Sequence, residues 1–423
     1  MGNTACGVPR AANCGGRSEM RTSLERHETN GVSAILMQPV LPVYDRPVLM
    51  NEAPETTDIL LHGQRVQITE VCPDESFDDS VAYNATRHGR LFHFVTDYGY
   101  DGYLPDAGGR LEPLSYLDTF YRREDIGVAD AERMRGLWQQ YAEIASAYED
   151  AYEEVEAKGY GNIYNPHAGL ATVWASCADL LPVTNITDTV SGRITLFRGA
   201  KLLVAADQDN VKSGWTRVYP ASTPFYGEEE HFSDEAGAET LEVGAYYIRS
   251  SALVPRFPLT EVQYDAATKM EGCAVYGHVM PENEPQFRRN VVEAAMLYRG
   301  TQYRWAGKTI NGIDCSGLCS MAYMLNGVYI YRDAEIVAGY PVRQILDAAQ
   351  WQADPKAALA RLRPADLLYY KGHITMYLGD GKYIHSTGKA GSDGVVINSF
   401  DPSDPLYRED LARDVLAAGS IFW

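Results

Sequence analysis

The order of helices and strands in the last third of the chain is the feature that most constrains its fold. Two amphipathic helices are predicted first, one ending near Gly300 and the other running over 315–326. A further helix is predicted over 342–350. Strands are then predicted over 367–370, 374–378, 382–385, 394–398 and 420–423. Helices followed by an antiparallel sheet are typical of an α+β fold, which is the fold class we predict.

A change in charge marks where this unit begins. From Pro285 onward the chain holds 15 Lys and Arg against 14 Asp and Glu, whereas the first 284 residues hold 22 against 43. The net charge of −20 therefore belongs to the N-terminal part, and no basic face for a nucleic-acid partner is expected. A chain of 423 residues suggests about three domains at roughly 150 residues each.

The N-terminal part is predicted to hold two small β units. Strand signals separated by turn residues over 33–112 and over 170–256 predict two small barrels. The segment 113–169 carries a helix with a heptad seam, which fits either a coiled-coil dimer or a helix packed on its own barrels. We predict that 1–32 is a disordered leader and that 257–284 is a linker.

Targeting signals are weak in this sequence. The leader lacks the apolar core of a signal peptide, and no apolar run approaches the roughly 18 residues of a membrane span. We therefore expect a cytoplasmic monomer without a membrane partner, or an envelope protein if the recorded start codon is wrong. The seven cysteines are scattered, so neither a disulfide framework nor a zinc site is expected.

Cys315 is the strongest candidate for a nucleophile. Asp314 is a good N-cap residue, and it would place Cys315 in the first turn of a helix. A helix N-terminus favours negative charge, so we predict a lowered thiol pKa. Ser316 and Gly317 are small and would leave the sulfur open. Cys319 lies one turn later and is predicted to be an inert core thiol.

Two histidines on neighbouring strands are the candidate bases, and the register of their hairpin decides whether the rings meet. A two-residue turn would set His385 opposite Met376 and put the rings on opposite faces. A three-residue loop over 379–381 would set His385 opposite Thr375 and put both rings on one face. We prefer the second register, with His373 as the base and His385 as the residue that orients it.

Other roles for these groups stay open. Diagonal histidines can chelate a metal, but no third ligand has clear spacing, so we expect no metal and no organic cofactor. The backbone N–H of Cys315 and the hydroxyl of Tyr303 are candidate oxyanion donors. Tyr303 also fits an aromatic cover for the helix.

Taken together, these strings resemble the NlpC/P60 family of papain-like cysteine peptidases. The similarity covers residues 285–423 and rests on YRWAG at 303–307, DCSG at 314–317, PADL at 364–367, HITMYLG at 373–379 and IHS at 384–386. The family splits bacterial cell-wall peptides, usually between γ-D-glutamate and a diamino acid. The resemblance implies Cys315 as nucleophile, His373 as base and His385 as orienting residue.

The upstream units resemble bacterial SH3 (SH3b) modules, through the string YGYDGY at 98–103. Two such modules before this domain resemble endopeptidases that recycle wall stem peptides and bind a free N-terminal L-alanine. The resemblance implies an amine site with Tyr103, Asp333 and an acid for which Asp58 is the candidate. Ser316 could contact the glutamate carboxylate. The family's Arg-Asp-Ser string has Ala334 in place of serine here, which weakens the case for an unchanged carboxylate pocket.

The function predicted from the sequence is a thiol endopeptidase for peptidoglycan stem peptides. One rival is a papain-like amidase or acyltransferase on the same scaffold. Another is a wall-binding protein whose SH3-like modules do the work, although the retained Cys315, His373 and His385 argue against it.

Overall fold

A computed structural model gives the fold. It describes residues 27–36, 39–46, 55–72, 91–96, 99–105, 111–113, 147–148, 150–151, 170–181, 193–205, 207–219, 246–253, 279, 281–390 and 392–423. Most of the predicted leader, helical segment and linker lies outside these residues. Among the described residues, no helix is long and apolar enough to cross a membrane.

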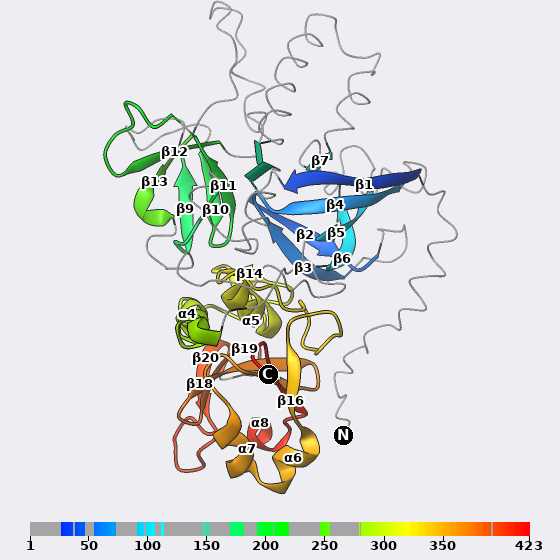
Figure 1. The fold of residues 1–423 in the computed structure, drawn as a ribbon, viewed down its shortest axis with the longest axis vertical. Coiled ribbons are helices and arrows are strands. Elements are labelled where there is room, and N and C mark those ends of the chain that lie inside the picture. The colour runs from blue at the N-terminus through cyan, green and yellow to red at the C-terminus, as the bar shows by residue number, and fades with distance from the viewer. Residues whose placement is uncertain are drawn as a thin grey trace, which may run out of the picture.

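Seven strands form the N-terminal sheet, in the order β3-β2-β6-β5-β4-β1-β7 (Figure 1). They are β1 His27–Leu36, β2 Val40–Tyr44, β3 Thr56–Leu61, β4 Arg65–Cys72, β5 Leu91–Thr96, β6 Asp101–Pro105 and β7 Leu111–Pro113. Strand β1 pairs with β4 from His27 onward, so the predicted leader is wrong over 27–32. The prediction also missed β2, where Pro42 interrupts the apolar pattern. Pro42 is tolerated because this part of β2 pairs with β3, and β6 joins only at Tyr44.

The second β unit consists of a four-stranded sheet, β13-β12-β11-β8, and a β10-β9 pair. Its strands are β8 Leu170–Thr172, β9 Cys177–Leu180, β10 Ile194–Phe197, β11 Lys201–Val204, β12 Trp215–Tyr219 and β13 Tyr246–Arg249, and a 3-10 turn, η4 Ser250–Ala252, follows. Tyr148, from the predicted heptad seam, donates its hydroxyl to the Tyr219 carbonyl at 2.8 Å and accepts from the Leu203 amide at 3.0 Å. This described part of the seam therefore packs on its own β unit. The SH3-like nature of the two β units stays a prediction.

The C-terminal unit is built on an antiparallel sheet in the order β16-β21-β17-β18-β19-β20. Its strands are β16 Arg343–Asp347, β17 Leu367–Tyr370, β18 His373–Gly379, β19 Lys382–Thr387, β20 Gly394–Ser399 and β21 Ala417–Ser420. The other elements are η6 Pro281–Asn283, α4 Glu284–Met296, β14 Lys308–Thr309, β15 Gly312–Ile313, α5 Cys315–Met324, α6 Ala348–Ala353, α7 Pro355–Arg361 and α8 Glu409–Arg413. The mixed helix and strand content predicted for this unit is confirmed.

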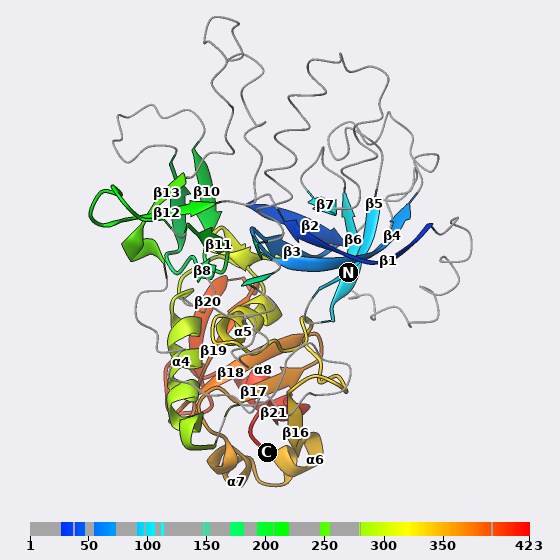
Figure 2. The same cartoon turned by 45° about the horizontal axis from the view of Figure 1, so that its top comes forward.

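Side chains on the sheet alternate between two hydrophobic layers. Leu367 and Tyr369 on β17 join the cluster that contains α4 and α5, whereas Leu368 and Tyr370 join the cluster around Trp351 of α6. Period-two alternation sends neighbouring strand residues to opposite faces. The sheet is therefore covered by α4 and α5 on one face and by α6, α7 and α8 on the other (Figure 2).

The prediction of a helix over 342–350 is wrong for its first half, which forms strand β16 instead. Residues of β16 pair with β21, and the helix begins only at Ala348. Asp347 starts it, because its carboxylate accepts from the Gln350 amide and the Gln350 side chain accepts from the Asp347 amide. The last strand, predicted over 420–423, ends at Ser420 instead.

Tight turns join the two β units to helix α5. The amide of Lys201 donates to the His62 carbonyl at 2.8 Å. Gly199 lies so close to Leu61, Met321 and Met324 that a Cβ there would meet their side chains at 2.7 to 3.0 Å. Strand β3 and helix α5 thus share one core, and Gly199 of the β10–β11 turn packs against it (Figure 1).

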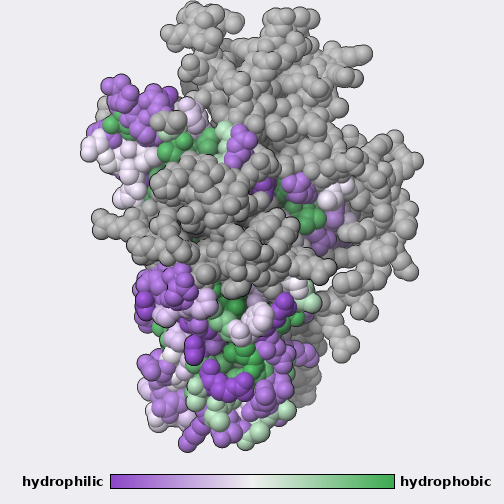
Figure 3. All heavy atoms as spheres, viewed as in Figure 1, coloured by the Kyte–Doolittle hydropathy of each residue, from purple (hydrophilic) through white to green (hydrophobic). Residues whose placement is uncertain are grey.

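On the face of the C-terminal unit seen in Figure 3, hydrophilic residues border a hydrophobic area. Large exposed apolar side chains of this unit are Leu297, Trp305, Ile310, Leu406, Leu416 and Trp423. Scattered apolar residues are normal on protein surfaces and do not by themselves indicate a partner.

A glycine pair tests the packing between the β units. Gly63 and Gly214 both have positive φ, +74° and +82°. A Cβ at Gly63 would meet the Lys201 carbonyl oxygen at 2.2 Å, whereas a Cβ at Gly214 has nothing within 4 Å. Gly214→Ala should cost about 1–2 kcal/mol through backbone strain alone. Gly63→Ala should cost about 1–3 kcal/mol more through overpacking. Urea unfolding of the two variants measures this, and equal losses would show that the units do not touch there.

Candidate active site

Helix α5 begins as predicted, with Asp314 as its N-cap. The Asp314 backbone is extended, and its carboxylate accepts from the Gly317 amide. Cys315 is the first helical residue and is buried. Gly317 has to be glycine, because a Cβ would meet the Gly307 carbonyl oxygen at 2.3 Å. The loop before the helix therefore holds the first turn tightly.

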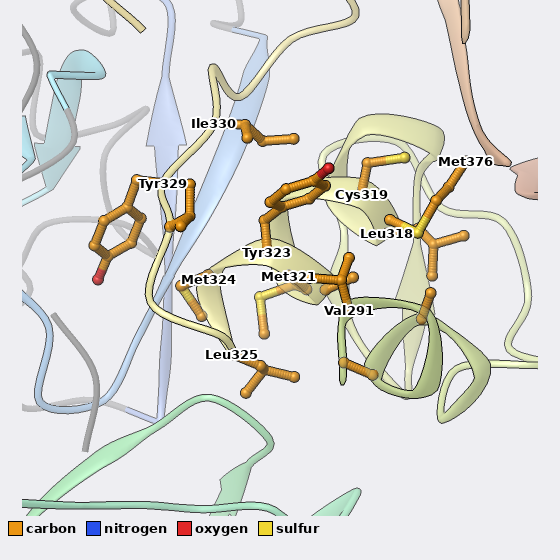
Figure 4. Close-up of a cluster of buried hydrophobic side chains, with 14 of the residues drawn as sticks. Val291, Leu318, Cys319, Met321, Tyr323, Met324, Leu325, Tyr329, Ile330 and Met376 are labelled. Atoms are coloured by element: carbon orange, nitrogen blue, oxygen red, sulfur yellow. The ribbon is translucent and has the colours of Figure 1, made fainter. Parts of the chain in front are cut away.

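Cys319 lies in the hydrophobic core, as predicted. Figure 4 shows it beside Leu318 and Met376, and its side chain is fully buried. Burial raises the pKa of the Cys319 thiol well above its ordinary value. Of the two cysteines on α5, only Cys315 lies at the helix start, beside strand β18.

The two histidines meet, but through a different hairpin from the one predicted. The turn has two residues, because Gly379 pairs with Lys382, and Asp380 and Gly381 both have positive φ. An irregularity between Tyr377 and Gly379 then shifts the ladder by one residue, so that Met376 pairs with Ile384. This register sets Thr375 opposite His385 and puts both rings on one face. The predicted register is confirmed, whereas the predicted three-residue loop is wrong.

A chain of hydrogen bonds runs away from His373. Its Nε2 lies 2.8 Å from Nδ1 of His385, and Nε2 of His385 lies 2.8 Å from Oδ1 of Asn398. Nδ2 of Asn398 donates to the Leu406 carbonyl at 2.9 Å. Because a carbonyl only accepts, the Asn398 amide is oriented with Oδ1 toward His385.

This orientation assigns the protons along the chain. Oδ1 of Asn398 only accepts, so His385 carries its proton on Nε2 and accepts at Nδ1. His373 must then donate from Nε2, which leaves a lone pair on its Nδ1. The ring nitrogens of the pair face each other and not a common point, so the arrangement does not favour chelation. Among the described residues, no three His, Cys, Asp or Glu side chains gather to hold a metal ion.

Burial favours the uncharged forms of Cys315, His373 and His385 in the free protein. Burial lowers the pKa of His373 to about 3 and that of His385 to about 4. Burial and the neighbouring Asp314 carboxylate raise the pKa of the Cys315 thiol to about 12. Backbone hydrogen bonds from Ile374 and Ser316 and the charge of Arg332 act in the opposite direction but are outweighed. The lowered thiol pKa predicted from the helix N-terminus is therefore wrong.

Cys315 lies against the strand that carries His373. The backbone of Ile374, the next residue, hydrogen bonds with the Cys315 sulfur. Cys315 and His373 share no hydrogen bond of their own among the described contacts. In apo enzymes such contacts often tighten only once substrate binds. The thiol therefore contacts the residue that follows His373, the histidine whose Nδ1 carries the lone pair.

Tyr303 lies near the thiol, where the sequence analysis placed it. It forms a parallel bridge with Ile313, two residues before Cys315. Burial raises the pKa of its phenol, and the nearby Cys315 and Asp314 raise it further. Tyr303 therefore keeps its proton and can donate it in a hydrogen bond.

Asp333 and Tyr103, both predicted for an amine site, differ in their surroundings. Burial raises the pKa of the Asp333 carboxyl to about 6, and among the described contacts its carboxylate has no hydrogen bond or ion pair. Tyr100, just before strand β6 of the N-terminal sheet, is a neighbour of Asp333, because the Asp333 charge raises the pKa of the Tyr100 phenol. The Tyr100 ring lies 6.1 Å from the ring of Tyr331. Tyr103 instead packs edge-on against His93 at 5.0 Å. Sequence analysis missed Tyr100, although it lies in the same YGYDGY string.

Asp58, the third residue predicted for the amine, is fully buried and its carboxylate is occupied. Lys308 Nζ lies 2.6 Å from Oδ2, and Arg332 Nε lies 2.6 Å from Oδ1. Arg332 also binds both oxygens of Asp314 at 3.1 and 3.0 Å and donates to the Ser316 hydroxyl at 2.7 Å. Two acids and two bases therefore form one buried network. The family resemblance had pointed to Arg332 only as part of the Arg-Asp-Ser string, and no local sequence signal linked Lys308 to this site.

Comparison with known proteins identifies the family. The NlpC/P60 family model matches residues 300–405, which include Cys315 and both histidines. A Lysinibacillus sphaericus protein named dipeptidyl-peptidase 6 is 48% identical over 245 residues, which cover 58% of this chain and 70% of that protein. The chain belongs to the NlpC/P60 family.

Two further similarities concern Bacillus cereus proteins. One, named gamma-D-glutamyl-L-lysine dipeptidyl-peptidase, is 29% identical to this NlpC/P60 protein over 105 residues, which cover 23% of this chain and 28% of that one. The other is a crystal structure of an NlpC/P60 family protein at 14% identity and a TM-score of 0.49, covering 91% of this chain and 98% of that chain. The family-model match and the 48% identical relative confirm the family resemblance stated from the motifs.

The raised thiol pKa predicts how Cys315 reacts in the free NlpC/P60 protein. Its alkylation by iodoacetamide should rise by about tenfold per pH unit between about pH 6 and 9, because the thiolate fraction rises that fast below the pKa. Exposed Cys177 is the internal control for the activity of the reagent at each pH. Peptide mass spectrometry measures both rates. A plateau for Cys315 at neutral pH would show a resting thiolate instead.

Proposed function

We propose that this protein is a papain-like cysteine endopeptidase that hydrolyses the γ-D-glutamyl–diamino acid bond of peptidoglycan-derived peptides. The observation that carries the proposal is the chain from Leu406 through Asn398 and His385 to His373. It leaves a lone pair on Nδ1 of His373, and the backbone of the next residue, Ile374, hydrogen bonds with the Cys315 sulfur. These groups fit the nucleophile, base and orienter arrangement of acyl transfer.

The proton order follows from the hydrogen bonds. Nδ1 of His373 takes the proton of Cys315 as the sulfur attacks the carbonyl carbon of the γ-glutamyl bond. The amide of Cys315 and the Tyr303 hydroxyl bind the oxyanion. The imidazolium, held by the acceptor Nδ1 of His385, then protonates the leaving amine. His373 next deprotonates a water, which attacks the acyl-enzyme and restores the thiol of Cys315.

Names of relatives support the bond we assign. Family members at 48% and 29% identity are named dipeptidyl-peptidase 6 and gamma-D-glutamyl-L-lysine dipeptidyl-peptidase. Both names describe removal of a dipeptide, which requires recognition of a free N-terminus. We infer the same class of substrate here, a stem peptide with a free N-terminal L-alanine.

Asp333 is the group that we assign to that terminal amine. The Asp333 carboxyl is partly buried and forms no ion pair among the described contacts, and desolvation raises its pKa to about 6 despite the charge of Arg332. An ammonium group would supply the missing charge. Tyr100, on the N-terminal sheet, would close this end of the site. Asp58 is left out of this assignment because Lys308 and Arg332 occupy its carboxylate, and Tyr103 because its described ring contact is with His93.

Substrate cleavage tests the catalytic roles. L-Ala-γ-D-Glu-diaminopimelate should yield L-Ala-D-Glu and free diaminopimelate, detected by mass spectrometry. Cys315→Ala should abolish cleavage, and His373→Ala should approach that loss because no other base is placed to replace it. Asn398→Ala should lose about 10- to 100-fold, since a loosened orienter costs less than the base itself. Amide exchange with an added amine in place of hydrolysis would favour an acyltransferase.

The pH dependence tests the amine site separately. An ammonium pairs only with the ionised carboxylate, so kcat/KM should rise with pH through about 6, the pKa of Asp333 in the free protein. It should fall above about 8, where the substrate amine loses its proton. Asp333→Asn should remove the lower limb, and N-acetylation of the alanine should reduce kcat/KM by more than about tenfold. Equal rates on free and acetylated tripeptides would contradict the amine site.

A further inference from the structure

Asp58 lies in the N-terminal sheet, yet its contacts belong to the start of the nucleophile helix. It is a residue of β3, and it is 250 residues from Lys308 and 274 from Arg332 in sequence. All four charged groups of the network are buried, with at most 5% of each side chain exposed. Charges removed from water need partners in fixed geometry, so this contact is specific.

The guanidinium of Arg332 has a different partner on each side. Its two terminal nitrogens grip both oxygens of Asp314, and one of them also donates to the Ser316 hydroxyl. Its Nε donates to Asp58. Asp314 and Ser316 are the residues immediately before and after Cys315. Because the guanidinium is rigid and planar, the Asp58 contact on one side of Arg332 fixes the positions of Asp314 and Ser316 on the other side.

We propose that Asp58 is a positioning residue for Cys315, acting from the N-terminal sheet through Arg332 on the first turn of α5. This inference rests on the proposed function for its activity readout, but the thiol provides a second readout that does not. The N-terminal unit thus completes the geometry of the nucleophile in addition to bordering the substrate. Asp58 does not touch the reacting atoms.

Charge balance allows positioning to be separated from stability. Asp58→Asn alone leaves Lys308 and Arg332 facing only Asp314, a surplus of one buried positive charge, and it should lower the melting temperature. Asp58→Asn combined with Lys308→Met removes one anion and one cation. The double variant should regain most of the lost melting temperature.

Activity and thiol chemistry should not recover with stability. In the folded double variant, kcat at saturating substrate should stay on the order of 10- to 100-fold low, because a catalytic group has moved. KM is not the readout, since the Asp58 charge also acts on Asp333. Iodoacetamide labelling of Cys315 should also change in rate, whereas labelling of Cys177 should not. Arg198→Gln is the matched control. Arg198 ties the second β unit to the Leu297 carbonyl at 3.2 Å but does not touch the network, so its loss should leave kcat and Cys315 labelling unchanged.

The results for the double variant distinguish a positioning role of Asp58 from a purely electrostatic one. If the double variant regains kcat along with its melting temperature, Asp58 acts only through charge balance and the proposal is wrong. Unchanged Cys315 labelling in the double variant overturns it as well. If the wild-type protein cleaves no stem peptide but Cys315 labelling shifts as stated, the proposed function fails and the positioning role stands.

Discussion

The buried guanidinium of Arg332 is the interaction on which the active-site end of the molecule depends. Asp314 is both the N-cap of α5 and a carboxylate enclosed by protein, and Arg332 supplies the cation that such a group needs. Arg332 is shared with Asp58, and Asp58 with Lys308, so the four charges sum to zero. Buried ion pairs therefore connect the N-terminal sheet to the first turn of helix α5.

Burial also affects the charge of the candidate catalytic groups in the free protein. The thiol of Cys315 and the imidazoles of His373 and His385 all favour their neutral forms in the free protein. Proton transfer then accompanies the attack of the sulfur, and the new charge is held by groups already in place. The Leu406 carbonyl ends the series of hydrogen bonds that starts at His373. Because it only accepts, it fixes which atom donates in each hydrogen bond of the series.

Backbone geometry brings these groups together as much as side-chain chemistry does. One irregular residue position in β18 lets a two-residue turn produce the register of a longer loop. Without that shift, His373 and His385 would point to opposite faces of the sheet. From the sequence we preferred the register that puts both rings on one face, but for the wrong reason, because the three-residue loop on which that preference rested does not form.

The sequence by itself determined the parts of the protein that local pattern controls. It predicted the α+β order, the Asp314 cap, the position of Cys315 at the helix start and the pairing of His373 with His385, because periodicity, capping and turn residues act over a few positions. Only the tertiary structure decided the rest. It turned the 342–347 segment into a strand through pairing with β21, and it brought Asn398 to His385 and Asp58 to Arg332 across 13 and 274 residues of sequence. It also reversed the expected shift of the Cys315 pKa, since burial is a property of the folded chain and outweighs the helix N-terminus.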